Sequence, residues 1–115
     1  MCGLGGIVSK VPIQNNLDEI LNHMGEAIFS RGPDSFGVWV GDDLNIGLVH
    51  RRLAILDLTE AGHQPMHSVS GRYIISFNGE IYNHLDLREA LQKLSPRSWQ
   101  GHSDTETLLA SIEQW

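Results

Sequence analysis

SFNGEIYNH, residues 76–84, decides how the middle of the chain folds. The Asn78-Gly79 pair ordinarily predicts a tight hairpin turn, because both residues accept a positive φ at little cost. The following segment, LDLREALQKL (85–94), places its leucines at helical rather than strand spacing. Asn78-Gly79 is therefore expected to join a helix to a strand that is predicted over Arg72–Phe77. The presence of the Asn-Gly pair needs an explanation other than a hairpin turn.

The rest of the chain alternates between strands and helices without repeats or low-complexity linkers. Asn16 with Glu19, and Ser103 with Glu106, have the spacing of capping boxes that begin a first and a last helix. The first helix is expected to end near Ser30, because Gly32 and Pro33 cannot continue it. Further strands are predicted at Cys2–Ser9, Ser35–Val40, Leu44–Arg51 and Leu53–Asp57. From the residues alone, the fold class is a mixture of α and β elements.

Composition limits the classes of protein that fit. With 115 residues, 41% of them hydrophobic, the chain is long enough for one globular core. A net charge of -6, with scattered lysines and arginines, argues against nucleic-acid binding. One cysteine excludes a disulfide framework and favours a reducing compartment. The first residues lack the features of a signal peptide, so we expect a soluble, cytoplasmic protein without a membrane span.

Cys2 is the first candidate for chemistry, because of its position. A single cysteine is usually a small buried residue chosen for packing, and position alone leaves that explanation ahead. If Met1 is removed, however, the Cys2 thiol lies beside a free α-amine. Such an amine ordinarily has a pKa of about 7.7–8.0, so near neutral pH part of it can act as a base for the thiol. The position is thus compatible with an N-terminal nucleophile.

Other motifs have plain structural explanations when taken singly. RGPD (31–34) is a turn, and HRRL (50–53) could be a solvated basic edge of a strand. His63 and His67 are interpreted as loop histidines, because Pro65 between them prevents a shared helix face and no thiol or carboxylate joins them. The glycines near the N-terminus do not open a helix, which excludes a dinucleotide-binding loop.

Taken together, the motifs resemble a known family. In order, MCGLGGI, RGPDSFG, HRRLAILDL, GHQPM, FNGEIYNH and SDTE are similar to the glutaminase domain of glutamine-hydrolysing asparagine synthetase. The resemblance covers nearly the whole chain. Glutaminase domains of the phosphoribosyl-pyrophosphate and glucosamine-phosphate amidotransferases share the Cys-Gly and the Asn-Gly but lack HRRLAILDL. Enzymes that make other amides with the same layout fit equally well.

The resemblance implies a role for the opening stretch. In the family, the cysteine that matches Cys2 attacks the side-chain amide of glutamine, and ammonia and a glutamyl thioester result. The side-chain amide of Asn78 and the backbone N–H of Gly79 match the donors that stabilise the oxyanion. Asn is a neutral donor, and Gly lets the backbone approach the substrate without obstruction.

The resemblance also implies how free glutamine is held. Arg52, rather than Arg51, matches the arginine that grips the α-carboxylate, a task for which two parallel hydrogen bonds are suited. Glu80 and Asp104 match the acids that hold the α-ammonium. The resemblance further implies backbone contacts from Ile55 to the substrate and ordering of the nucleophile loop by Arg31.

By resemblance, the fold is α+β, an N-terminal nucleophile hydrolase sandwich of two antiparallel sheets face to face with helices outside. We expect residues 1–115 to be a partial type 2 glutamine amidotransferase domain without the synthetase domain. No cofactor or metal is expected for the glutaminase half, whereas ATP and Mg²⁺ belong to the synthetase domain. Expected partners are glutamine, a synthetase domain or partner chain that receives ammonia, and a possible second copy. The alternative is a non-catalytic fragment that folds or binds only within a larger assembly.

Overall fold

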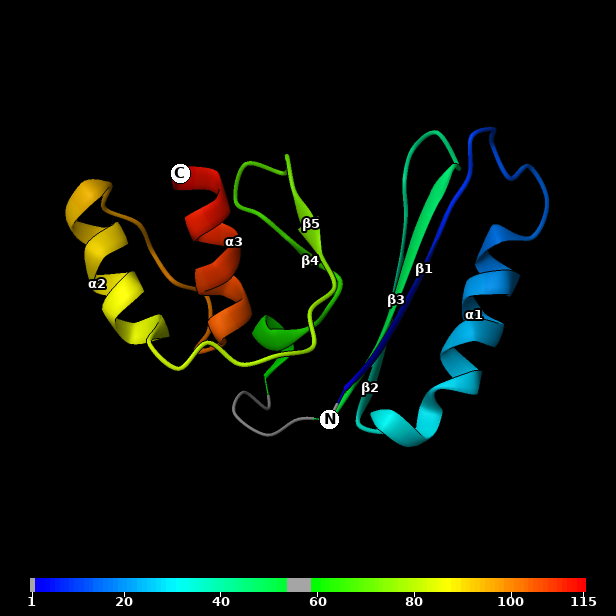
Figure 1. The fold of residues 1–115 in the computed structure, drawn as a ribbon, viewed down its shortest axis with the longest axis horizontal. Coiled ribbons are helices and arrows are strands. Elements are labelled where there is room, and N and C mark those ends of the chain that lie inside the picture. Colours follow the sequence, from blue (N-terminus) through cyan, green and yellow to red (C-terminus); the bar gives the residue numbers. More distant parts are fainter. Residues whose placement is uncertain (1, 54–58) are drawn as a thin grey trace. The chain divides into compact units, whose positions relative to one another are not determined.

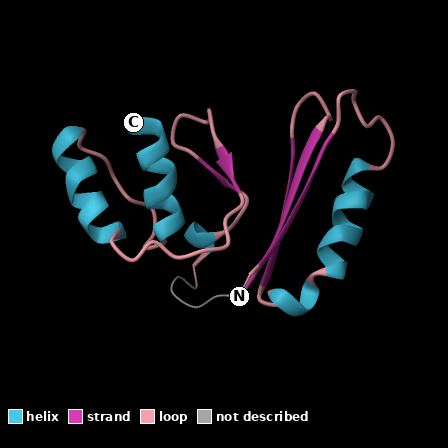
Figure 2. Cartoon of the chain, in the orientation of Figure 1, coloured by secondary structure: helices cyan, strands magenta, loops and turns pink. Residues whose placement is uncertain are grey.

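The structure is a computed structural model, and it describes residues 2–53 and 59–115. Its contacts form two compact units rather than one core, and the units are interleaved along the chain. The first unit holds residues 2–53, 63–65 and 76–78, and the second holds residues 59–62, 66–75 and 79–115. Figure 1 labels the α-helices and the strands, and Figure 2 separates helices, strands and loops. In chain order they are β1 (Gly3–Val8), α1 (Leu17–Ala27), η1 (Phe29–Arg31), β2 (Ser35–Val40), β3 (Ile46–Arg52), η2 (Glu60–Gly62), β4 (Met66–His67), β5 (Ile74–Ile75), α2 (His84–Leu94) and α3 (Asp104–Gln114).

The first unit is a three-stranded antiparallel sheet, in the order β1-β3-β2, with α1 against one face (Figure 1). Side chains alternate between the faces of a strand, so every second residue of β3 faces α1. Val49 on that face and Leu21 of the helix are fully buried, and Leu17 beside them is also buried. These three form the core of the unit, and partly buried apolar residues of the sheet and helix surround them.

The predicted strands of this unit are confirmed with small shifts. β2 has the predicted bounds, β1 is one residue shorter at each end, and β3 begins at Ile46 instead of Leu44. Leu44 has a positive φ of 54° and donates to the Gly41 carbonyl, so it belongs to the hairpin turn. Of the strand predicted over Leu53–Asp57, residues 54–57 lie outside the described residues, and Leu53 itself is not in a strand.

The capping box predicted at the start of α1 is wrong. Asn16 is the N-cap residue, but its backbone is left-handed (φ 64°, ψ 25°) and its side chain makes no capping hydrogen bond. An N-cap side chain reaches the first turn from an extended backbone, which the left-handed conformation does not provide. Asp18 and Glu19 in the first turn still have the charge that favours a helix N-terminus.

The second unit consists of η2, α2, α3 and the short β4–β5 hairpin. Leu91 of α2 and Leu109 of α3 are buried, as expected for the apolar faces of two packed helices. β4 contains His67, which was predicted to be a loop histidine, and β5 covers two residues of the strand predicted over Arg72–Phe77. The strand is short because Phe77 bonds to side chains instead of to a neighbouring strand. No hairpin follows Asn78-Gly79, and the link from strand to helix is confirmed.

The cap predicted for α3 is confirmed on the serine side. The Ser103 hydroxyl accepts a hydrogen bond from the Glu106 backbone N–H at 3.3 Å. The Glu106 carboxylate accepts from the backbone N–H groups of Gln100 and Gly101, at 2.8 and 3.0 Å. Glu106 therefore fixes the loop that leads into α3.

The α+β class and the two antiparallel sheets are confirmed. Their face-to-face stacking stays a prediction, because each sheet belongs to a different unit. Across the described ranges, no helix is both long enough and apolar enough to span a membrane.

Candidate active site

Cys2 lies at one end of the first sheet, immediately before β1. Gly3 pairs with Arg51 and Ser35 pairs with Arg52, so the start of β1 and the end of β3 are neighbours. The Cys2 sulfur accepts a hydrogen bond from the Leu53 N–H at 3.4 Å and donates to the Leu53 carbonyl at 3.7 Å. The register of the sheet therefore brings the predicted nucleophile close to the residue that follows Arg52.

The two arginines of HRRL have different surroundings. Arg51 is buried on the α1 side, where its Nε donates to the Gly25 carbonyl at 3.0 Å and Nη2 pairs with Glu26 at 2.6 Å. Its guanidinium also lies over the Phe36 ring, 4.2 Å from the centroid. Arg52, the next residue in the strand, has its side chain on the opposite face of the sheet. Arg51 therefore holds α1 to β3, consistent with the assignment of Arg52 as the carboxylate-binding residue.

The loop that contains Arg31 closes against this same end of the sheet. Arg31 ends η1 and is exposed, and the Asp34 N–H donates to the Arg52 carbonyl at 3.0 Å. A side chain at Gly32 would overlap the Arg51 and Arg52 backbone, so only glycine allows this close approach. RGPD is thus a turn, as predicted, that packs on the strand carrying Arg52.

Asn78 is exposed and belongs to the first unit, but the residue before it is held firmly. His50 Nε2 lies 3.2 Å from the Phe77 carbonyl oxygen, and the Phe77 N–H donates to Gln64 Oε1 at 2.6 Å. Burial lowers the pKa of His50 below its ordinary value; the Phe77 contact acts against this, and His63 and Arg52 add to it. The predicted oxyanion donor therefore follows an anchored residue.

Gly79, Glu80 and Asp104 belong to the second unit. Asp104 is the first residue of α3 and is buried, and its Oδ2 accepts the Ile81 N–H at 2.7 Å. The Ile81 N–H belongs to the peptide unit that joins Glu80 to Ile81. The bond therefore holds this peptide unit against the Asp104 carboxylate. The two acids predicted to bind one ammonium group are therefore neighbours within this unit.

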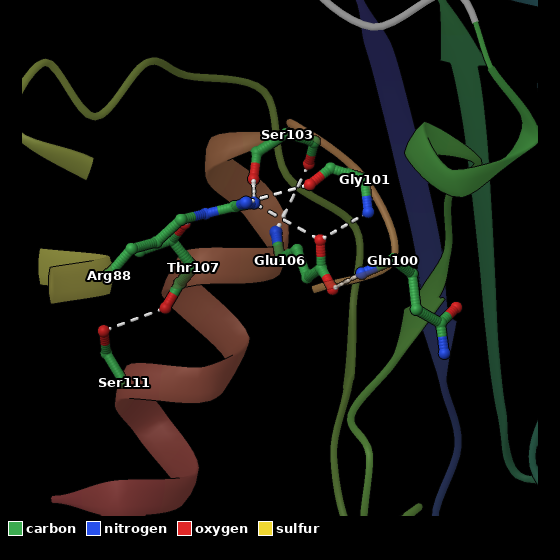
Figure 3. Close-up of polar contacts among 7 residues, drawn as sticks. All are labelled: Arg88, Gln100, Gly101, Ser103, Glu106, Thr107 and Ser111. Carbon is green, nitrogen blue, oxygen red and sulfur yellow. Dashed lines mark hydrogen bonds and ion pairs between the residues drawn. The ribbon is translucent and has the colours of Figure 1, made fainter. Parts of the chain in front are cut away.

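Arg88 is a central residue of the second unit that the sequence analysis did not single out (Figure 3). Its guanidinium donates to Thr107 Oγ1 at 2.8 Å and to the Gly101 and Ser103 carbonyls at 2.8 and 2.9 Å. It also pairs with Glu106 at 3.3 Å, and these two side chains are only 12% and 15% exposed. Its acceptors lie next to Asp104 in the sequence, so Arg88 fixes the N-terminus of α3 from α2. Only its place in the helix that follows Asn78-Gly79 could have drawn attention to it.

The remaining predictions concern Ile55, metal binding and the distribution of the site residues between the two units. Ile55 lies outside the described residues. Among residues 2–53 and 59–115, no group of three or more histidines, cysteines, aspartates or glutamates is arranged to hold a metal ion. Cys2, Arg52 and Asn78 are thus placed in the first unit, while Gly79, Glu80 and Asp104 are placed in the second.

Comparison with known proteins identifies the family. The family model of the glutamine amidotransferase domain matches residues 1–115. The chain belongs to the glutamine amidotransferase domain family. The resemblance inferred from the motifs is therefore confirmed.

Curated relatives agree with this membership. Asparagine synthetase [glutamine-hydrolyzing] 1 of Bacillus subtilis (strain 168) is 40% identical over 117 residues, which cover 100% of this chain and 18% of the relative. The asparagine synthetase [glutamine-hydrolyzing] of Zea mays is 31% identical, with 100% and 19% covered. Amidase chry2 of Gibberella zeae is 34% identical, with 100% and 18% covered. The chain thus spans about a fifth of the length of these relatives.

Proposed function

We propose that this glutamine amidotransferase domain hydrolyses glutamine to glutamate and ammonia, with the Cys2 thiol as nucleophile. The observation that carries the proposal is the register of the first sheet, which puts Cys2 and Arg52 at the same end. A nucleophile and a carboxylate-binding arginine at one place suit a substrate that is a free amino acid. Family membership and the names of the relatives support the same reaction.

The chemistry follows from an N-terminal cysteine. After removal of Met1, the free α-amine takes the thiol proton, and the sulfur bonds to the side-chain amide carbon of glutamine. The carbonyl electrons move onto oxygen. When they return, the C–N bond breaks, and ammonia leaves with the proton that the amine returns. Water then attacks the thioester, releases glutamate and restores the thiol.

The oxyanion of each tetrahedral intermediate needs donors that are already in place. We assign this role to the Asn78 side-chain amide and the Gly79 backbone N–H. Removal of one such donor typically costs about 10²–10³-fold in rate. This is the functional reason for an Asn-Gly pair that makes no hairpin.

The remaining site residues hold the amino-acid part of glutamine. Arg52 is proposed to bind the α-carboxylate, and Glu80 with Asp104 the α-ammonium. The hydrogen bond from the Ile81 N–H supports the role of Asp104, because it fixes one carboxylate oxygen and leaves lone pairs on the group for a substrate. Backbone contacts from Ile55 and loop ordering by Arg31 complete the proposal.

The ammonia is proposed to serve asparagine synthesis or the synthesis of a related amide. Its acceptor would be bound by a synthetase domain or a partner chain, as the names of the relatives suggest. The hydrolysis itself uses only thiol, amine and amide chemistry. We therefore assign ATP and Mg²⁺ to the synthetase reaction.

A glutamine hydrolysis assay on wild-type chain and Cys2→Ala tests the proposal. Cys2→Ala should abolish glutamate release and leave glutamine binding, measured by calorimetry, within about twofold, since the thiol is not among the groups that grip the amino acid. Undiminished hydrolysis by Cys2→Ala would contradict the proposed nucleophile. Equal loss of binding would mean that the substitution had damaged the site as a whole.

A further inference from the structure

The segment Ser76–Asn78 is tied to the first unit by side chains rather than by a strand ladder. The Ser76 hydroxyl donates to the Val49 carbonyl at 3.4 Å. Gln64 and His50 then bind the two backbone polar groups of Phe77, at 2.6 Å on its N–H and 3.2 Å on its C=O. Both side chains are buried, with 8% and 1% of their surface exposed.

The His50 contact fixes the orientation of Asn78 through the peptide bond. The Phe77 carbonyl and the Asn78 nitrogen belong to one planar peptide unit. Holding that carbonyl therefore sets the direction in which the Asn78 backbone begins. The bond from Gln64 holds the preceding peptide unit, so the two bonds together fix the φ and ψ angles of Phe77 and set the point from which Asn78 starts.

The hydrogen bond also defines the form of the imidazole. A carbonyl can only accept, so Nε2 carries the proton and Nδ1 carries the lone pair. Nδ1 is buried and has no hydrogen-bond partner among the described residues. Burying a polar atom without a partner costs free energy. An apolar side chain would fill the same space without this cost, so packing alone does not explain a histidine at position 50. The lowered pKa of His50, caused mainly by burial, is consistent with this neutral form.

We propose that His50 and Gln64 are positioning residues that aim the Asn78 side-chain amide at the oxyanion formed on glutamine. The inference rests on the proposed function. β3 then orients three parts of the site, because it carries His50 and Arg52, and Leu53 immediately after it contacts the Cys2 sulfur. A side chain at Gly37, which pairs with His50, would overlap the Gln64 carbonyl, so the Gln64 backbone lies directly on β2.

Two matched pairs of variants test the proposal by kcat and KM for glutamine hydrolysis. Gln64→Met removes the acceptor for the Phe77 N–H, whereas Gln64→Glu keeps it. His50→Asn is too short to donate to Phe77, whereas His50→Gln places an amide N–H at the reach of Nε2. We expect the disrupting member of each pair to lower kcat by about tenfold or more, because a small misplacement of a catalytic group can cost about 10²-fold. KM should change less than about twofold, since the oxyanion exists only after binding.

The double variant with Asn78→Ala separates positioning from general stability. If Gln64 acts through Asn78, Gln64→Met should cost little further rate in the Asn78→Ala background. A full additional loss there, or a rise in KM with kcat unchanged, would overturn the proposal. If Gln64→Met fails to fold, His50→Asn with Asn78→Ala carries the same prediction. A wild-type chain without hydrolysis would contradict the proposed function itself, and the positioning role would fall with it.

Discussion

Arg51 and Arg52 show how adjacent residues of one charge acquire different tasks. Arg51 is buried between Gly25, Glu26 and the Phe36 ring, so its guanidinium is committed to the packing of α1 on β3. Alternation along the strand puts Arg52 on the other face. The sequence pattern HRRL does not distinguish the two, and the assignment of Arg52 came from the resemblance.

Arg52→Lys should weaken glutamine binding although the charge is kept. An ammonium cannot reproduce a planar two-bond grip, and a hydrogen bond to a charged group contributes about 1.5–3 kcal/mol. We expect KM to rise about tenfold or more in the hydrolysis assay. Arg51→Lys is the control. It should lower the melting temperature and leave KM unchanged, because Arg51 packs α1 on β3. An unchanged KM for Arg52→Lys would move the carboxylate contact elsewhere.

His50 predicts a dependence of stability on pH. Its pKa is lowered from the ordinary 6.5, mainly by burial, with further lowering by His63 and Arg52 and a contrary effect of the Phe77 bond. Below pH 6.5 the unfolded chain binds a proton that the folded chain resists. The contribution of neutral His50 to the free energy of unfolding is therefore complete above pH 6.5. It is lost as the pH falls through the lowered pKa that His50 has in the folded chain.

The test is denaturant unfolding of wild type and His50→Gln between neutral and mildly acidic pH. Wild type should lose more free energy of unfolding on acidification than His50→Gln, which keeps the donor to Phe77 but cannot titrate. His23→Gln, at an exposed position of α1, should behave like wild type. Parallel curves for wild type and His50→Gln would contradict the prediction.

At the scale of elements, the α2–α3 pair depends on Arg88 (Figure 3). Arg88→Met should lower the free energy of unfolding by about 3 kcal/mol, because it leaves Glu106 and two backbone carbonyls without their partly buried donor. Lys93→Met, on the same helix, breaks the exposed pair with Glu89 and should leave the unfolding midpoint unchanged. Equal effects of the two substitutions would show that the Arg88 network is dispensable.

Local sequence patterns predicted the helices and strands that are long enough to show a regular spacing of apolar residues. The leucine spacing of residues 85–94 located α2, and the predicted strand ranges located β1, β2 and β3. The failures have physical causes: Asn16 adopts a left-handed backbone, and β4 is too short to show any period. The partners of Phe77 and Arg88 lie 13 to 27 and 13 to 19 residues away, at separations for which sequence offers no signal.

At the scale of the whole molecule, exposed apolar surface predicts self-association. β1 and β2 are the outer strands of the first sheet as described, and Leu4 and Val8 of β1 are 47% and 78% exposed. Unpaired strand edges with apolar side chains favour pairing with another chain. Light scattering over a concentration series should show a mass above that of the monomer. Val8→Lys should reduce it, whereas a monomeric wild type at all concentrations would contradict this expectation.

The central claim is that Cys2, once freed from Met1, is the nucleophile of an assembled glutamine site. Intact-mass spectrometry after exposure to a glutamine-mimicking diazoketone tests it directly. Processed and unprocessed chains in one sample differ by the mass of a methionine residue, so each can be scored separately. We predict one label on the processed chain, located on Cys2 and prevented by excess glutamine, and none on the chain that retains Met1. Equal labelling of both chains, or labelling that glutamine does not prevent, would contradict the account.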